Sequence, residues 1–185
     1  MTDQEENRAE PNSVVVGQAQ HGDKSALGQI YDAYARPIYR YHYSRTGNTH
    51  DAEDLTAQTF VAVIEALPRY QHRGHFTAWI FQIARNKAMN HFRKNHNQES
   101  LDFSPADLTH AEPIDTVINR QAQAKLRHLL SLLDDDEREL IRLRYSAGLS
   151  FVEMATLLGR KEDAVRKSLK RLLERLSKEM EVENA

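Results

Sequence analysis

Two stretches of the chain concentrate basic side chains in the pattern of surfaces that bind nucleic acid. Between positions 85 and 94, four residues are basic and none is acidic, and Asn86 and Asn90 lie among them, four residues apart. Cationic side chains hold phosphates, and a side-chain amide can read the edge of a base. The stretch therefore predicts a surface that contacts an anionic partner such as nucleic acid.

The second basic stretch, 161–178, contains seven lysines and arginines against three acids. It follows a short apolar segment and Gly159, which suits a turn with a left-handed backbone, while Val165 and Leu169 are expected as buried anchors. A short helix, a tight turn and a basic helix form the helix-turn-helix pattern of DNA-binding proteins. The side chains expected to face a major groove are Lys161, Arg166, Lys167, Lys170 and Arg171.

The apolar residues recur every three or four positions, and glycine and proline are few, so an all-α fold is predicted. In the first half, a first helix is expected to be capped by Asp23 and to kink or break at Pro37. A second helix is expected to start at Thr49 or Asp51 and to stop at Pro68. A third is expected from Phe76 to about Lys94. In the second half, the acidic run 134–136 caps a helix that ends at Gly148, Ser150 caps a short helix over 151–158, and a long basic helix covers 162–179.

Helical periodicity disappears between positions 95 and 113, where polar residues and two prolines dominate. This composition is typical of a linker and predicts two small helical domains joined by a flexible segment. We expect the two domains to move independently in the free protein. The predicted division is a disordered acidic tail over 1–19, a first domain over 20–95, a linker over 96–116, a second domain over 117–180 and a tail over 181–185.

Composition excludes several classes of protein. Cysteine is absent, which excludes disulfides and thiolate metal sites and favours a reducing, cytoplasmic location. No apolar run approaches the roughly 18 residues that span a bilayer, so no membrane insertion is expected. The formal net charge of −2 hides the separation of basic patches from acidic segments.

The histidines raise a rival interpretation, in which the protein is an enzyme. The dipeptide His50-Asp51 resembles that of the HD-type metallophosphohydrolases, and the chain has nine histidines. Such a site needs further histidine and aspartate ligands that converge on the dipeptide, and the sequence offers none at a recognisable spacing. We therefore expect no catalytic residue, no metal and no cofactor.

Longer motifs carry a resemblance to a known family. Asp51-Ala-Glu-Asp-Leu-Thr-Ala-Gln-Thr-Phe60 and the segment 74–93 resemble regions 2.1 to 2.4 of the extracytoplasmic function (ECF) sigma factors of bacterial RNA polymerase. Residues 133–176 resemble region 4 of the same family, including Leu143-Arg-Tyr145 before Gly148-Leu-Ser150. The resemblance covers roughly 20–95 and 117–178, in the order and spacing of the family.

This resemblance implies a transcription initiation factor without catalytic chemistry of its own. Region 2 would bind the β′ clamp helices of core RNA polymerase and recognise the −10 element of promoter DNA. Region 4 would dock on the β flap and read the −35 element, and the linker would thread through polymerase. An anti-sigma factor is a further partner that the family implies.

The resemblance also assigns residues to the first domain. The −10 contacts expected in the loop 72–75 and the helix after it are Arg73, His75, Phe76, Arg85, Asn86, Lys87, Asn90 and Arg93. The expected polymerase contacts are Asp51, Asp54, Gln58 and Thr59. The chain departs from the family here, because Ala57 and Gln58 stand where the family has Gln and Glu before Thr59.

A stand-alone repressor or activator is the second alternative. A helix-turn-helix protein that binds a palindromic operator as a dimer would explain residues 134–178. It would leave the pattern between Asp51 and Arg93 without a role. A repressor should bind its operator without polymerase, whereas a sigma factor should act as a monomer on polymerase.

Overall fold

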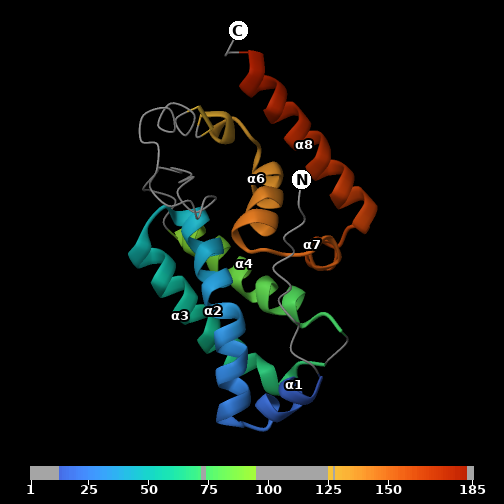
Figure 1. The fold of residues 1–185 in the computed structure, drawn as a ribbon. Helices are drawn as coiled ribbons and strands as arrows, with labels where there is room; N and C mark the ends of the chain where they lie inside the picture. Colours follow the sequence, from blue (N-terminus) through green and yellow to red (C-terminus); the bar gives the residue numbers. More distant parts are fainter. Residues whose placement is uncertain (1–12, 72–73, 95–124, 127, 183–185) are drawn as a thin grey trace, which may run out of the picture.

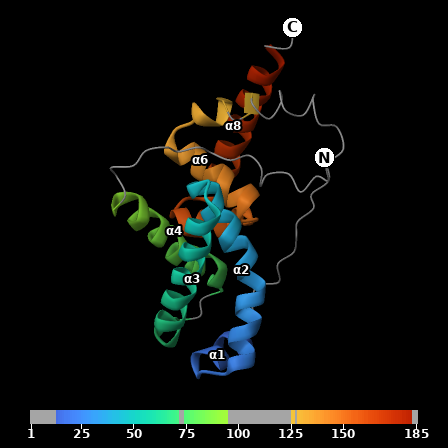
Figure 2. The ribbon, with the colours of Figure 1, turned by 90° about the vertical axis from the view of Figure 1, so that its left-hand side faces the viewer.

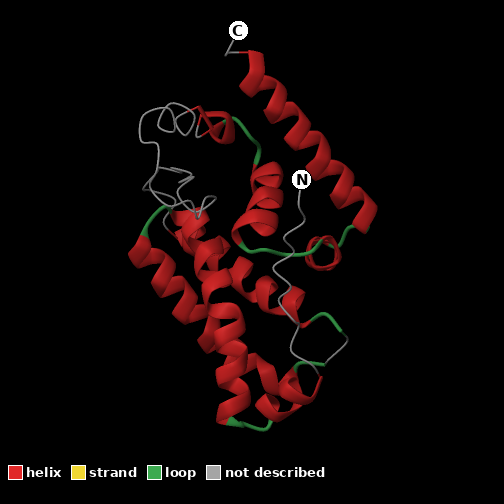
Figure 3. Cartoon of the chain, in the orientation of Figure 1, coloured by secondary structure: helices red, strands yellow, loops and turns green. Residues whose placement is uncertain are grey.

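A computed structural model describes residues 13–71, 74–94, 125–126 and 128–182. Within these ranges all regular structure is helical, and no strand is present (Figure 3), which confirms the predicted all-α class. The elements are α1 (Ser13–Gln20), α2 (Lys24–Thr46), α3 (Thr49–Ala66), the short 3-10 helix η1 (Leu67–Arg69), α4 (Phe76–Lys94), α6 (Asp135–Ile141), the π-helical turn η3 (Arg142–Ser146), α7 (Phe151–Leu158) and α8 (Glu162–Val182).

The first unit is a bundle of α2, α3 and α4 with α1 at its foot (Figure 1). α2 and α3 form a hairpin, and the turn between them uses Gly47 in the left-handed conformation. The bundle core takes large side chains from several helices, among them Ile30, Tyr34, Ile38 and Phe81. This core fixes α4 and thereby decides which face of α4 meets solvent.

The helix signals of the first half are partly confirmed. Asp23 caps α2 by accepting from the backbone N–H of Ala26 at 2.8 Å. Pro37 neither breaks nor ends α2, because tertiary packing of buried residues on both sides of it holds the helix together. The cap of α3 is Asn48, whose side chain accepts from two backbone N–H groups, and not Thr49 or Asp51. α3 gives way to η1 at Leu67, as the stop at Pro68 predicts.

The predicted disordered tail is wrong for residues 13–19. These residues lie in α1, where Val16 is fully buried and Ala19 nearly so. Gln20 at its end donates to the backbone carbonyls of Leu67 and Tyr70 and ties α1 to the turn after α3. An eight-residue helix gives little periodic signal, which is why the sequence alone does not reveal it.

The second unit follows its predicted signals closely. Asp134 and Ser150 each form a capping box with a glutamate three residues later, at the starts of α6 and α7. Gly159 ends α7 in the left-handed conformation, and α8 follows. Before α6, residues 125–126 and 128–131 are helical, and the linker 96–116 lies outside the described residues.

The two units pack against each other, so the expectation that they move independently is wrong for this conformation. α2 contacts η3, and α4 contacts α7. Figures 1 and 2 show from two directions that α6 and α7 sit against the bundle. The Tyr41 hydroxyl and the Arg45 guanidinium both donate to Glu139 of α6 at 2.8 Å. Buried polar groups therefore join the two units, and the sequence pattern does not predict which of these groups contact each other.

His42 is a buried histidine that makes the stability of the first unit dependent on pH. The hydroxyl of Thr59 donates to the carbonyl of Leu55, so its oxygen accepts from His42 Nε2–H at 3.0 Å. Nδ1 has no hydrogen-bond partner in the described part of the chain, so a second proton there would find no acceptor. Burial, with a smaller effect of Arg45, lowers the pKa of His42 from 6.5 to about 3.

We therefore predict that acid destabilises the folded chain through His42. The unfolded chain takes up a proton below about pH 6.5 while the folded chain does not. Stability is therefore complete above that pH and falls by about 1.4 kcal/mol per pH unit towards pH 3. Urea unfolding at pH 7, 6 and 5 should show a shallower pH dependence for His42→Gln than for the wild type. The exposed His50→Gln is the matched control, and equal slopes for all three chains would contradict the assignment.

Candidate nucleic-acid interface

The outward face of α8, together with the residue just before the helix, carries the five basic residues predicted to face a major groove. The opposite face buries Val165, Leu169, Leu172 and Leu176, which recur every three or four positions. This stripe fixes the rotation of α8 about its axis and turns the basic positions outward. The side chains of the following residues are all exposed: Lys161, Arg166, Lys167, Lys170 and Arg171.

Arg166 is held in place before any DNA binds. Its guanidinium donates to Glu162 at 2.7 Å, one turn earlier on α8. The same group lies 4.4 Å from the centre of the Phe151 ring, and Arg144 lies over that ring at 4.9 Å. An aromatic ring in contact with two guanidinium groups restricts their rotamers and favours a fixed direction of approach to a base edge.

α4 carries most of the predicted −10 residues and exposes a polar strip of them. Asn86, Asn90 and Arg93 are exposed, Lys87 is partly buried, and His75 is exposed just before the helix. Asn86 accepts a hydrogen bond from Gln82 at 3.1 Å. The two amides and the nearby cations therefore share one accessible surface. Arg73 lies outside the described residues.

The structure corrects Phe76, which was expected as a base contact. Its ring is fully buried and packs edge-on against Tyr34 and Tyr70, with ring centroids 5.8 and 5.3 Å away. Trp79 lies in the same cluster, with its ring centroid 5.3 Å from that of Phe76. No face of the Phe76 ring is free to stack on a base in this conformation.

The predicted polymerase surface on α3 is reduced by one residue. Asp54 and Gln58 are exposed and Asp51 is partly so, whereas Thr59 is fully buried against His42. Thr59 is therefore a structural residue here and not a contact. Beside Asp54 and Gln58, α3 also exposes two apolar side chains, Val61 and Ile64.

A buried polar cluster between the units is the part of the site that the sequence does not predict. Glu139, only 5% exposed, accepts from Tyr41 and Arg45, and Arg85 Nε forms an ion pair with it at 3.3 Å. The geometry of the Arg85 contact is that of an ion pair and not of a hydrogen bond. Arg85 was expected on the −10 surface, so the same side chain belongs to both sites.

The electrostatics of this cluster follow from its burial. Burial and the neighbouring Glu139 raise the pKa of Tyr41 far above 10, so the phenol keeps the proton that it donates. Burial lowers the pKa of Arg142 to about 10, with a contribution from Arg45. Burial also lowers the pKa of Arg45, but Tyr41 and Glu139 outweigh it and raise the value overall. Several arginine side chains of the cluster thus share the one carboxylate of Glu139 as their counter-charge.

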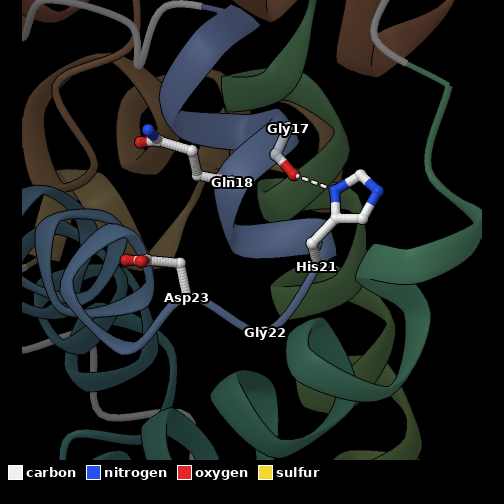
Figure 4. A pocket seen from close by; sticks show the side chains of 5 residues that line it. All are labelled: Gly17, Gln18, His21, Gly22 and Asp23. Atoms are coloured by element: carbon white, nitrogen blue, oxygen red, sulfur yellow. Dashed lines mark hydrogen bonds between the residues drawn. The ribbon is translucent and has the colours of Figure 1, made fainter.

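In the part of the chain that the structure describes, other surface features do not form a competing site. An open hollow at the turn between α1 and α2 is lined by Gly17, Gln18, His21, Gly22 and Asp23 (Figure 4). His21 and Asp23 are both engaged there, by the carbonyl of Gly17 and the backbone of Ala26. In the described ranges, no three acidic or histidine side chains gather as they would around a metal ion. None of the described helices has the length and apolarity to cross a membrane.

Two family models match the chain, one for each unit. Residues 30–98 match Sigma-70 region 2, and residues 123–176 match Sigma-70, region 4. The region 2 match covers most of α2 with α3 and α4, and the region 4 match covers α6, η3, α7 and most of α8. They agree in order and position with the motifs of the two units.

Relatives and a solved structure agree with these matches. The chain is 32% identical over 156 residues to the ECF RNA polymerase sigma factor BldN of Streptomyces coelicolor, covering 82% of this chain and 59% of that protein. It is 30% identical over 177 residues to the ECF RNA polymerase sigma factor SigD of Mycobacterium tuberculosis, covering 90% and 82% of the two chains. The solved structure of CnrH in complex with the cytosolic domain of CnrY is similar, with a TM-score of 0.64 and 25% identity over 91% of this chain and 96% of that chain.

Proposed function

Because this chain belongs to the ECF sigma factors, which direct RNA polymerase in promoter-specific transcription initiation, we propose which of its surfaces perform each step. α4 binds the opened −10 element, α8 reads the −35 element as duplex, and the exposed part of α3 binds the β′ clamp helices of core polymerase. The second unit also docks on the β flap. Polymerase supplies the catalytic chemistry, and the protein acts in the cytoplasm.

The observation that carries the proposal is the pair of exposed basic faces on different helices, one in each unit of the chain. On α4, amides accompany the cations, which suits the reading of unstacked bases. On α8, Arg and Lys lie along the second helix of a helix-turn-helix, which suits a major groove. Without α4 and α3 the second unit alone would resemble a stand-alone repressor, so the first unit decides between the two functions.

The polymerase contact can be tested by reversing one exposed charge. Asp54→Lys should weaken binding to core polymerase about tenfold or more, because like charges across an interface repel and the side chain is exposed on the proposed surface. Asp32→Lys makes the same change of charge on an exposed position of α2 and should leave binding unchanged. Titration of labelled core enzyme measures both. Equal binding by the two variants and the wild type would move the contact away from this face of α3.

A second part of the proposal concerns a protein that inhibits this chain. The similar protein CnrH was solved in complex with the cytosolic domain of CnrY. We propose that an anti-sigma factor acts on this chain too, by covering the surface that polymerase needs. Exposed apolar side chains beside the proposed polymerase contacts, namely Tyr31, Val61 and Ile64, offer area for such a partner.

A further inference from the structure

α1 ends on a side chain that reaches the segment between α3 and α4. The helix packs against α2 and against η1, which follows α3 (Figure 1). The side-chain amide of Gln20 donates two hydrogen bonds there, to the carbonyl of Leu67 at 3.0 Å and to the carbonyl of Tyr70 at 2.6 Å. The acceptors lie 47 and 50 positions further along the chain. One side chain of α1 therefore holds the backbone at the start of η1 and just after its end.

Tyr70 is the residue at which the helical hydrogen bonding of η1 stops. Its own N–H still donates to the Leu67 carbonyl at 3.0 Å and closes η1. Its backbone has already become extended, with φ −67° and ψ 128°. A carbonyl beyond the last helical turn needs a donor from outside the helix, and the Gln20 amide supplies one. The direction in which the chain leaves η1 thus depends on Gln20.

The ring of Tyr70 links this segment to the start of α4. Its centroid lies 4.6 Å from that of Trp79 and 5.3 Å from that of Phe76. Phe76 is fully buried and is the first residue of α4. The Trp79 N–H donates to the carbonyl of His75 at 3.1 Å, so the backbone of His75 begins the helix. The aromatic cluster of Tyr70, Phe76 and Trp79 therefore fixes the backbone just before α4.

His75 takes its direction from α4, because the residue before it offers little restraint. Gly74 has φ +73° and no Cβ. In the described part of the chain, nothing except its chain neighbours lies within 4 Å of the position that a Cβ would take. The His75 side chain is exposed and was expected among the −10 contacts. A change in the first turn of α4 therefore also redirects His75.

We propose that Gln20 is a positioning residue for −10 recognition, which sets the direction of His75 through Tyr70. The inference rests on the proposed binding of the −10 element at α4. It adds that base preference depends on α1, which lies outside residues 30–98 that match Sigma-70 region 2. A hydrogen bond to a base edge weakens strongly when its atoms move apart by about 0.5 Å. A small change at Tyr70 is therefore enough to alter the preference.

A structural role is the alternative, in which Gln20 only holds α1 on the bundle. Loss of a structural bond lowers the stability of the folded chain and weakens transcription from all promoters alike. Loss of a positioning bond changes the preference for one base. The test therefore compares base preference and not the amount of transcript alone.

Three variants of the full-length chain separate these roles. Gln20→Glu keeps the shape of the side chain but can no longer donate to the two carbonyls, because a carboxylate only accepts. Gln18→Glu makes the same change at an exposed position of α1 and is the matched control. Val16→Ala truncates a fully buried side chain of α1, which lowers stability but keeps both hydrogen bonds of Gln20.

Trp79 is the only tryptophan of the chain, so its fluorescence reports the aromatic cluster directly. In the free, folded Gln20→Glu chain, Trp79 emission should shift to longer wavelengths, and quenching by acrylamide should increase. Gln18→Glu should keep the wild-type emission. Circular dichroism shows whether each variant is folded, and Gln20→Met, which also lacks the donor, replaces Gln20→Glu if that variant does not fold. Unchanged emission in a folded Gln20 variant would overturn the proposal.

Base preference is measured in holoenzyme formed with saturating core polymerase. Templates melted in advance carry each base in turn at each position of the −10 element. His75→Ala should lower the preference about tenfold at one position, and Gln20→Glu should lower it at the same position. Together the two changes should have the effect of His75→Ala alone, because the misdirected side chain is then absent.

Two kinds of result would overturn the proposal at this step. One is an unchanged preference in Gln20→Glu, or the same loss with and without the His75 side chain. The other is an equal loss of preference in Val16→Ala, which would make the effect one of stability. Failure of the proposed function is distinguishable, because the wild type would then give no promoter-specific transcript. Trp79 emission in the free chain does not depend on polymerase or DNA.

Discussion

Replacing Arg166 and Lys170 together by alanine should abolish −35-dependent transcription while leaving binding to core polymerase intact. Each side chain is exposed on the outward face of α8, and Arg166 is fixed by Glu162 and Phe151. Loss of a base contact costs about 1–3 kcal/mol, so the pair should reduce promoter binding by about two orders of magnitude. Run-off transcription on one promoter measures the loss.

Salt dependence tells which kind of contact each side chain makes. A base contact should relax specificity at one position of the −35 element, whereas a phosphate contact should weaken all sequences alike and reduce the salt slope by about one. Lys178→Ala removes an exposed cation from the same helix, outside the proposed contacts, and serves as the control. Unchanged transcription by the double variant would remove the −35 role from this face of α8.

The second large effect is expected on α4. Alanine at both Asn86 and Asn90 should reduce the formation of open complexes on intact duplex about a hundredfold, because two base-reading amides on one exposed surface are lost. Binding to core polymerase should not change. Gln29→Ala, an exposed amide on α2, is the matched control.

A template that is melted in advance separates reading from melting. If the two amides read bases, melting the −10 region beforehand should not restore transcription to the variant fully. Full rescue would mean that the amides contribute only to strand opening. Normal transcription on both templates would place the base-binding pocket elsewhere.

Local signals were the part of the fold that the sequence predicted well. Gly159 at the turn, Ser150 as a cap and the buried anchors Val165 and Leu169 all act within a few residues of their neighbours. The same holds for Asp23 at the start of α2. Caps, turns and the spacing of apolar residues are written in adjacent positions, so a single sequence reveals them.

Contacts between distant segments could not be predicted in this way. Tyr41 and Arg45 meet Glu139 from 98 and 94 positions away, and no periodicity pairs them. The burial of Phe76 and Thr59 likewise depends on how the helices pack and not on their local pattern. Both residues resembled contacts in the sequence, and the packing of α2, α3 and α4 places them inside.

Run-off transcription with purified core polymerase shows whether this chain directs promoter-specific initiation. A library of genomic promoter fragments should give discrete transcripts only when the chain is added, and those fragments should share a −10 and a −35 sequence at fixed spacing. Core polymerase alone should give none of them. The absence of any chain-dependent transcript, together with failure to bind core enzyme, would contradict the account.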